Sequence, residues 1–302
     1  MTLVCLPWSD PQVLEKVLPP GIDCVTYDGS GEIARAAEVE FFVPPYMGAA
    51  HTLEVMASMP SLKVVQALTA GVDNVWQHLP HGVALCNAKG VHDASTAELA
   101  VGLTIASLRK FPEFARAQES GQWLYDRYDA LADKTVLIVG FGSVGAALQA
   151  RLIAFEVNIL KVARTARGEV EGFDALPALL GQADVVILTC PLTDQTRGLV
   201  DHTFIAAMKQ GALLVNVSRG PVVNTDDLLA ALTSGRIKAA LDVTDPEPLP
   251  ANHGLWRAPG VFISPHVGGN TSAFLPRAYR LVSDQLQRFV AGEPLLHVMS
   301  AP

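Results

Sequence analysis

Short hydrophobic runs, rich in β-branched residues, alternate with longer segments of helical periodicity along most of the chain. This alternation is typical of α/β proteins with parallel sheets. A long helix is expected over residues 93–117, and residues 123–134 have the pattern of a connector. Upstream of that helix the pattern predicts strands at 2–6, 23–26, 39–43, 62–66 and 83–86.

A second series of hydrophobic runs begins after the connector, at residue 135. Helical segments separate most of these runs, including one over 146–154, and a last helix is expected over 271–291. The chain therefore predicts a second parallel sheet. Its strands are expected at 135–139, 158–162, 184–188, 212–217, 237–243 and 261–264.

Length and composition agree with two globular domains. The chain has 302 residues, of which 50% are hydrophobic and 17% are charged, and domains typically contain about 100–200 residues. There are 22 Lys and Arg against 30 Asp and Glu, which gives a formal net charge of −8. Such a balance argues against broad binding to nucleic acid, which requires a basic face, but it does not exclude a small anionic ligand.

Neither a membrane protein nor a metalloprotein is predicted. The longest apolar stretches, 97–108 and 135–145, contain Glu98 or several glycines and fall short of the roughly 18–20 residues that a membrane span needs. The first twelve residues have no secretory pattern, so a cytoplasmic location is expected. The four cysteines have no C-x-x-C spacing, which favours reduced thiols over zinc or disulfides. No histidine spacing suggests a metal site.

A glycine motif follows the first strand of the second series. Residues 135–139 lead into Gly140-Phe141-Gly142-Ser143-Val144-Gly145, and a helix follows. Glycines at these positions allow a tight turn, close approach to a pyrophosphate and close packing of helix on strand. The alternative is a tight turn without a ligand, but the strand–turn–helix context favours dinucleotide binding.

The end of the next strand bears on the choice of cofactor. An acidic residue that binds the ribose of NAD is expected about 20 residues beyond the glycine loop. Ala163 lies 18 residues beyond Gly145 and is followed by Arg164, Thr165 and, two residues later, Arg167. This pattern favours NADP(H) over NAD(H), because arginine pairs with a 2′-phosphate that an acid would repel. Alternatively, both arginines are solvated surface charges.

Three polar residues follow the last three strands of the second series: Arg219, Glu247 and His266. In the expected strand order 3-2-1-4-5-6 these strands are neighbours, so the side chains should converge at one sheet edge. Arg219 could hold a carboxylate and polarise a carbonyl, His266 could transfer a proton, and Glu247 could orient the imidazole. A structural ion pair, a surface carboxylate and a strand-end histidine are the alternatives.

Taken together, these segments resemble the D-isomer-specific 2-hydroxyacid dehydrogenase family. The similarity runs from about residue 62 to the C-terminus and includes 68–74, 92–98, 140–145, 191–196, 216–220, 242–248 and 264–266. The resemblance implies an α/β protein of two doubly wound parallel-sheet domains. A Rossmann nucleotide domain (96–271) would be inserted into a flavodoxin-like substrate domain made of 1–95 and 272–302.

The resemblance also implies further site residues. Backbone N–H groups of Ala70, Gly71 and Val72 would hold the substrate carboxylate, with Arg219 and His266 also on the substrate, and Asp242 would meet the nicotinamide carboxamide. The other implied cofactor contacts, besides the glycine loop and residues 163–167, are Thr96, Cys190, Pro191, Thr196, Val217, Ser218 and Gly268.

The function expected from these residues is reduction of a small anionic 2-oxoacid to its D-2-hydroxyacid with NADPH. Ala163-Arg164-Thr165 resembles the family's NADP-using glyoxylate/hydroxypyruvate reductase branch, and Glu247 differs from the Gln of its formate dehydrogenases. The family's usual homodimer makes 93–116 a candidate interface. Two alternatives stay open: the same chemistry with NAD, or a non-catalytic dinucleotide-sensing interaction protein like the family's transcriptional corepressors.

Overall fold

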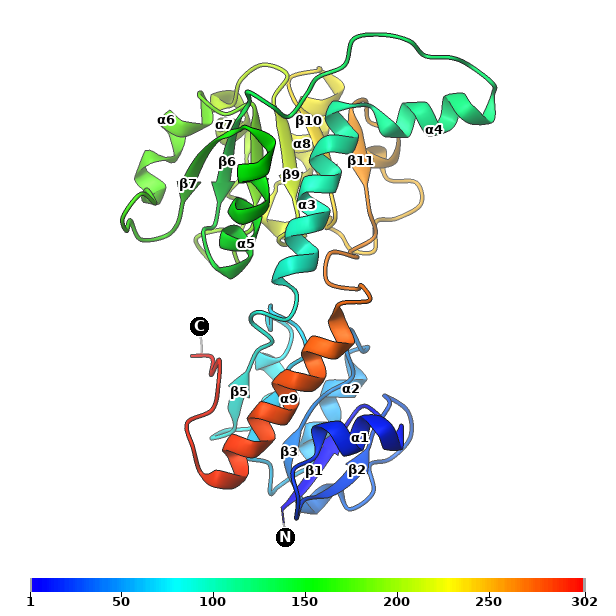
Figure 1. The fold of residues 1–302 in the computed structure, drawn as a ribbon, viewed down its shortest axis with the longest axis vertical. Helices are drawn as coiled ribbons and strands as arrows, with labels where there is room; N and C mark the ends of the chain where they lie inside the picture. The colour runs from blue at the N-terminus through cyan, green and yellow to red at the C-terminus, as the bar shows by residue number, and fades with distance from the viewer. Residues whose placement is uncertain (1, 301–302) are drawn as a thin grey trace. The chain divides into compact units, whose positions relative to one another are not determined.

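The computed structural model of the protein describes residues 2–300. They form two compact α/β units (Figure 1). One unit runs up to His92 and resumes at Ser272, and the other is Asp93–Thr271. The second unit is thus an insertion into the first, and each has its own sheet and its own hydrophobic cores.

The first unit is built on a five-stranded parallel sheet with the order β2-β1-β3-β4-β5. This is the flavodoxin-type order, in which helices cover both faces of the sheet. The four residues of β1, an interior strand of this sheet, are accordingly all buried. Its strands are β1 (Leu3–Leu6), β2 (Asp23–Thr26), β3 (Val39–Phe42), β4 (Val64–Gln66) and β5 (Ala84–Cys86).

The helices of this unit come from both ends of the chain. The C-terminal helix α9 (Phe274–Ala291) packs beside α1 (Pro11–Val17). Its buried face includes Phe274, Val282 and Leu286, which belong to the same core as β1 and β3. The shorter helices are η1 (Ala36–Glu38), α2 (His51–Glu54), η2 (Val55–Ser58) and η3 (Trp76–His78).

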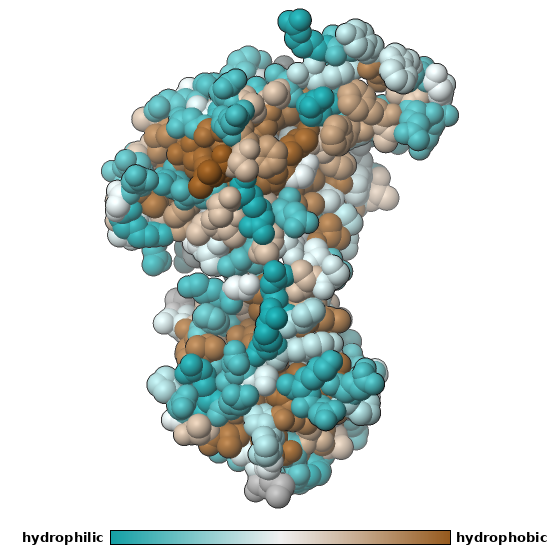
Figure 2. All heavy atoms as spheres, in the orientation of Figure 1, coloured by the Kyte–Doolittle hydropathy of each residue, from teal (hydrophilic) through white to brown (hydrophobic). Residues whose placement is uncertain are grey.

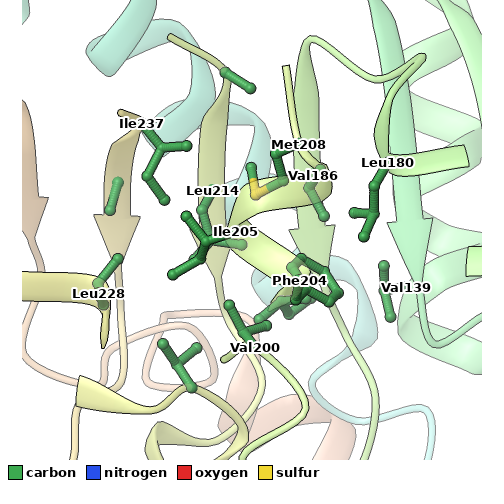
Figure 3. Packing of buried hydrophobic residues seen from close by; sticks show 14 of the residues in the cluster. Val139, Leu180, Val186, Val200, Phe204, Ile205, Met208, Leu214, Leu228 and Ile237 are labelled. Atoms are coloured by element: carbon green, nitrogen blue, oxygen red, sulfur yellow. The ribbon is translucent and has the colours of Figure 1, made fainter. Parts of the chain in front are cut away.

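The second unit contains a six-stranded parallel sheet with the order β11-β10-β9-β8-β6-β7. Helices α3 and α5 supply one core against the sheet, and α6, α7 and α8 supply the other. Figure 3 shows Phe204 and Ile205 of α7 packed toward Val186 and Leu214 of the sheet. The strands are β6 (Thr135–Val139), β7 (Asn158–Val162), β8 (Val185–Leu188), β9 (Leu213–Asn216), β10 (Lys238–Leu241) and β11 (Val261–Ile263).

The helices of this unit connect consecutive strands of the sheet or precede it. They are α3 (Asp93–Leu108), α4 (Phe111–Glu119), α5 (Ser143–Leu152), η4 (Ile153–Phe155), η5 (Phe173–Ala175), α6 (Leu176–Leu180), α7 (His202–Ala207), η6 (Gly220–Val222), α8 (Thr225–Thr233) and η7 (Gly254–Arg257).

The predicted strands are confirmed with small shifts of their ends, but the predicted strand order was wrong in one place. The third run of the second series, β8, lies beside β6 rather than outside β7. The position outside β7 is taken by Glu171, which forms a single parallel bridge with Val162. A single bridged residue, in a segment between Gly168 and Gly172, is too short to give the hydrophobic pattern of a strand.

The predicted helix over 93–117 was also wrong, because it consists of two helices. Lys110 has φ +56° between α3 and α4, and Pro112 lies in the first turn of α4, where its missing N–H costs nothing. No helix or strand follows until β6 at Thr135, as the connector pattern predicts. In Figure 1, α4 and this connector extend away from the sheet of their unit.

The surface carries hydrophilic side chains over much of the visible face, with apolar side chains gathered near β7 (Figure 2). Ile153, which directly follows α5, is 65% exposed. Among residues 2–300, the helices are too short or too polar to cross a bilayer.

Candidate active site

The glycine motif forms the turn between β6 and α5, and its geometry excludes side chains at two positions. Gly140 has φ +100°, and a Cβ there would overlap the backbone of Cys190. Its N–H donates to Val162 O at 2.8 Å, which draws the turn against β7. A Cβ on Gly145 would lie 2.8 Å from Gly140 O. These two glycines therefore permit contacts between backbone atoms that close the turn.

Helix α5 begins at this turn without a side-chain cap. Gly142 is its N-cap residue and offers no side-chain hydrogen bond. Gly142 is exposed, and a Cβ on it would meet nothing within 4 Å. The first N–H groups of the ten-residue helix are thus left for an external acceptor, and the helix dipole favours an anion there. Ser143, Val144 and Gly145 form this first turn.

The segment after β7 carries the predicted cofactor-selecting residues. Ala163 is buried and donates its N–H to Glu171 O at 3.0 Å, whereas Arg164 and Thr165 are exposed. Arg167 reaches the glycine turn, because its Nη2 donates to Phe141 O. Its Nη1 donates to Thr165 O at 3.3 Å. The structure thus ties Arg167 to the turn and leaves the Arg164 guanidinium exposed to solvent.

Lys161, which was not among the predicted site residues, also contacts the glycine turn. Its Nζ lies 5.7 Å from the centroid of the Phe141 ring. The same Nζ pairs with Glu169 at 2.9 Å. A cation over an aromatic face is attracted by the ring quadrupole, so Lys161 helps to hold the glycine turn.

Further predicted cofactor residues follow the carboxyl ends of β8 and β9. Burial raises the pKa of the Cys190 thiol to about 11, so this thiol stays protonated at neutral pH. Thr196 is buried, and its hydroxyl donates to Pro191 O at 2.6 Å. Val217 and Ser218 come directly after β9 and are buried. Because β8 and β9 are parallel neighbours, Val217 and Ser218 lie at the same carboxyl edge of the sheet as the residues that follow β8.

The backbone of Arg219 is held by Asn216, which was not among the predicted site residues. Asn216, the last residue of β9, accepts hydrogen bonds from the N–H and hydroxyl of Ser218 through Oδ1, at 3.0 and 2.8 Å. Its Nδ2 donates to Arg219 O at 3.0 Å. Asparagine makes such turns with the following backbone, and its place before Val-Ser-Arg is the signal that could have identified it.

A close backbone contact joins the ends of β9 and β10. A Cβ on Gly220 would overlap Thr244 O, so the Arg219–Gly220 segment lies directly against the segment that leads to Glu247. The Arg219 charge is one of the influences that lower the pKa of Glu247. Gly220 is required here for close approach rather than for an unusual φ.

His266 and Glu247 form a short polar pair at this edge. Nδ1–H of His266 donates to Glu247 Oε1 at 2.5 Å. The side chains are 29% and 38% exposed, respectively. Burial alone would raise the pKa of Glu247, but the hydrogen bond from His266 and the charges of His266 and Arg219 bring it below its ordinary value. An ionised carboxylate only accepts, so Nδ1 carries the proton and Nε2 is left to exchange one with a ligand.

The loop after β11 is organised by Asp242, which is only 3% exposed. Its Oδ1 accepts from Ser264 Oγ at 2.6 Å and from Val267 N–H at 2.9 Å. Its Oδ2 accepts from Gly268 N–H at 2.9 Å. Thr96 of α3 is adjacent, since its Cγ2 would lie 3.6 Å from a Cβ on Gly268. Ser264 was not among the predicted site residues.

The remaining predicted residues, Ala70, Gly71 and Val72, lie after β4 in the first unit. The Ala70 and Gly71 carbonyls accept from Asn87 Nδ2 at 2.8 Å and from Thr69 Oγ1 at 2.7 Å. Within residues 2–300, the three N–H groups at 70–72 have no acceptor. Successive free N–H groups form a concave site that suits an anion. Thr69 and Asn87, which fix this loop, were missed.

The described part of the chain, residues 2–300, contains no group of three or more His, Cys, Asp or Glu side chains that could hold a metal ion. The four cysteines are free thiols, three of them buried.

The uncapped α5, the cradle that side chains at Gly140 and Gly145 would fill, and the absence of an acid at Ala163 fit a dinucleotide in the second unit. Beside this cradle, an arginine and a histidine–carboxylate pair come from neighbouring strands. Fold and site together define a dinucleotide-dependent oxidoreductase.

Comparison with known proteins gives the family. The NAD binding domain of D-isomer specific 2-hydroxyacid dehydrogenases matches residues 101–268, more than half of the chain. The chain belongs to this family and is an NAD(P)-dependent 2-hydroxyacid dehydrogenase. Human glyoxylate reductase/hydroxypyruvate reductase is 36% identical over 253 residues, which cover 79% of this chain and 77% of the human protein.

Solved structures show the same fold over nearly the whole chain. A D-isomer specific 2-hydroxyacid dehydrogenase from Xanthobacter autotrophicus, in complex with NADPH and MES, is 30% identical with a TM-score of 0.82, covering 99% of this chain and 98% of that chain. An NADPH-dependent glyoxylate/hydroxypyruvate reductase from Sinorhizobium meliloti, in complex with NADP and sulfate, is 26% identical with a TM-score of 0.83 and the same coverage.

Proposed function

We propose that the protein reduces a small 2-oxoacid, of the size of glyoxylate or hydroxypyruvate, to the D-2-hydroxyacid with NADPH. The observation that carries this proposal is the His266–Glu247 pair, joined at 2.5 Å, on the sheet edge that holds the glycine turn and Arg219. The human and Sinorhizobium relatives, which are named for glyoxylate and hydroxypyruvate, support the choice of substrate.

In this proposal the dinucleotide supplies the hydride, and the protein's side chains stabilise the developing negative charge and transfer the proton. Arg219 binds the 2-oxoacid and polarises its carbonyl, which stabilises the negative charge that develops on the oxygen. His266 donates the proton from Nε2 to that oxygen. Glu247 holds the ring through Nδ1 and stabilises its charged form. In the reverse direction His266 removes the proton from the hydroxyl.

Two further contacts complete the proposal. The free N–H groups at Ala70–Val72 receive the substrate carboxylate, since oriented backbone donors bind anions without a counter-charge. The Asp242 carboxylate accepts three hydrogen bonds from the loop after β11. A carboxylate has about four acceptor positions, and the remaining one suits the nicotinamide carboxamide.

We propose NADPH as the preferred cofactor because Arg164 is exposed two residues after β7 and Ala163 stands where an acid that binds the ribose of NAD is expected. Arg164→Ala should lower kcat/KM for NADPH about ten- to hundredfold, by loss of a charge-assisted contact, and leave kcat/KM for NADH almost unchanged. Arg151→Ala is the matched control, because Arg151 donates to Ala147 O within α5. An equal loss with both cofactors would contradict this preference.

The activity itself is tested with a panel of 2-oxoacids that includes glyoxylate, hydroxypyruvate and phenylpyruvate. Each is supplied to the purified protein with NADPH and, separately, with NADH, and nicotinamide absorbance is followed. We expect turnover of the small acids and a higher kcat/KM with NADPH. Tight cofactor binding without turnover of any 2-oxoacid would refute the proposal and favour a dinucleotide-sensing protein.

We also propose a homodimer formed through the second unit. Trp123 and Tyr125, in the connector after α4, are each 91% exposed, and Phe111 at the start of α4 is 48% exposed. Ile153 on the same unit is 65% exposed. The second unit therefore exposes aromatic side chains in and beside the connector and an apolar side chain after α5. A two-fold dimer would cover both surfaces. Sedimentation should show a dimer, and Trp123→Ser with Tyr125→Ser should shift it toward monomer.

We place the enzyme in the cytoplasm, because free cysteines such as Cys5 and Cys24 in adjacent strands suit a reducing compartment. Cell fractionation tests this location. Recovery of the protein outside the cytoplasm would contradict it.

A further inference from the structure

We propose that Ser264 and Asp242 act together as a positioning pair that holds His266 for proton transfer. Neither residue is assigned this role by the proposed reaction, on which the inference rests. In that reaction His266 carries the proton and Glu247 orients the ring. The pair acts on the backbone of His266 rather than on its ring.

The backbone of His266 is the feature that needs support. Its φ of +53° lies in the left-handed region, which residues other than glycine rarely adopt. Its N–H donates to Asp242 O at 2.8 Å and to Ser264 O at 3.1 Å. The conformation is therefore held by contacts with the two residues of the proposed pair, and not by the preference of histidine.

The Asp242 side chain fixes the same loop on both sides of His266. Ser264 Oγ, two residues before the histidine, donates to Oδ1 at 2.6 Å. Val267 and Gly268, which follow the histidine, donate their N–H groups to Oδ1 and Oδ2. A single buried carboxylate thus closes a ring of hydrogen bonds around residues 264–268. Hydrogen bonds to an ionised group are stronger than neutral ones.

Ser264 is the member of this ring that can be removed with the least disturbance. It lies at the end of β11, and its N–H remains bonded to Leu241 O at 2.8 Å whatever its side chain. Without the hydroxyl, Oδ1 loses one of two donors, and the carboxylate can turn toward Val267 and Gly268. The segment Ser264–His266 then has less restraint, so His266 approaches Glu247 and the substrate in a wider range of orientations.

The test compares Ser264→Ala with Ser264→Thr, which keeps the hydroxyl. Ser234→Ala is the matched control, because Ser234 donates to Ala231 O at 3.1 Å in the same unit, at the end of α8. For each variant we would measure kcat, the KM for the 2-oxoacid, the Kd for NADPH and the melting temperature. Proton NMR would follow the downfield Nδ1–H resonance of His266, identified by its loss in His266→Ala.

For Ser264→Ala we expect kcat to fall about tenfold, as for loss of one charge-assisted hydrogen bond. The Nδ1–H resonance should broaden or shift, while KM and the NADPH Kd change less than about threefold, since only an orienting contact is lost. Ser264→Thr should restore most of kcat and the resonance, and Ser234→Ala should change neither. A merely structural role would lower the melting temperature without changing the resonance.

Unchanged kcat and an unchanged Nδ1–H resonance in a folded Ser264→Ala protein would overturn the inference, as would a loss that Ser264→Thr shares although it is folded. The NMR readout needs no substrate. If wild-type protein turns over no 2-oxoacid, the proposed function fails, while a response of the resonance to Ser264→Ala would still support the positioning pair.

Discussion

Both sheets of this protein are parallel and doubly wound, but the turns that follow β6 and β1 differ in chemistry. After β6 the turn contains Gly140, Gly142 and Gly145, and α5 starts without a side-chain cap. After β1 the turn has no glycine, Pro11 occupies the start of α1, and Asp10 accepts from Gln12 N–H at 2.9 Å. The N-terminus of α5 is therefore open to an anion, whereas the N-terminus of α1 is closed by Asp10 and Pro11.

This difference shows that the sheet alone does not make the nucleotide site. Both architectures place a helix N-terminus at the carboxyl edge of a parallel sheet, where ligands of such folds bind. Only the glycine turn leaves the N–H groups of its helix accessible. The strand ends beyond this turn carry Arg219, Glu247 and His266, whereas the loop after β4 in the first unit carries backbone N–H groups at Ala70–Val72 that have no acceptor within residues 2–300.

The largest effect is expected when the proton donor at the edge of the second sheet is removed. His266→Ala should lower kcat about 10²–10⁴-fold, the range for loss of a general acid. The NADPH Kd should stay within about twofold, because the turn and α5 are untouched. Steady-state rates and fluorescence titration provide both values.

A second histidine–carboxylate pair in the same unit provides the control for His266→Ala. His202 Nδ1 lies 3.8 Å from Asp227 Oδ2, and its side chain is 81% exposed. His202→Ala should leave kcat and Kd unchanged. A similar loss of kcat in both variants would show that the loss does not come from the reaction site.

The glycine turn can be examined by two substitutions that act differently. Gly142→Ala should weaken NADPH binding about thirtyfold or more and barely change stability, because its Cβ meets no protein atom within 4 Å but would approach a pyrophosphate. Gly140→Ala should in addition destabilise the fold by about 2–3 kcal/mol, through positive φ and overlap with Cys190. Calorimetric titration and denaturant unfolding separate the two. Normal NADPH affinity in Gly142→Ala would mean that the turn does not bind phosphate.

Glu247 gives a smaller effect with a defined dependence on pH. Glu247→Gln should lower kcat about tenfold at neutral pH, since the amide cannot stabilise the charged imidazole. The folded-state pKa of Glu247 lies below its ordinary value of 4.5. Its contribution is therefore fully present above that value and is lost as the pH falls through the lowered pKa.

The pH profile of kcat/KM checks this prediction. Wild-type protein should show an acid limb below pH 4.5 that Glu247→Gln lacks, with Glu293→Gln as the control for an exposed carboxylate. An acid limb of the same size in both Glu247→Gln and wild type would show that another group sets it.

The smallest effect is expected at the closed turn of the first unit. Asp10→Ala removes the cap of α1 and should destabilise the protein by about 1 kcal/mol. It should not change kcat or the NADPH Kd, because this helix end binds no ligand in our account. Denaturant unfolding and steady-state rates measure these quantities, and a clear loss of NADPH affinity would contradict the contrast between the two turns.

Most of the fold could be predicted from the sequence, because buried parallel strands leave clear hydrophobic runs. β2, β6 and β7 have the predicted bounds. The strand order was predicted wrongly because the Glu171 bridge is too short to leave a pattern. The break at Lys110 was missed although Pro112 is a signal for the start of a new helix, because a single left-handed residue between α3 and α4 carries no periodic signal.

The residues that carry the chemistry could be singled out, but those that support them could not. Arg219, Glu247 and His266 each follow the end of a hydrophobic run, which is visible in one dimension. Asn216 and Ser264 are ordinary polar residues at strand ends, and their roles depend on contacts across the turn. Thr69 and Asn87 are 18 residues apart, so their joint hold on one loop becomes visible only when β4 and β5 pair.

The proposed reduction of a 2-oxoacid by NADPH is tested most directly by following the transferred hydride. NADPH carrying deuterium at the transferable C4 position is incubated with the protein and the best 2-oxoacid of the panel. The product is then analysed by mass spectrometry and chiral chromatography. We predict one deuterium at C2 of a D-2-hydroxyacid. An unlabelled product, an L-hydroxyacid, or no product from protein that binds NADPH would contradict it.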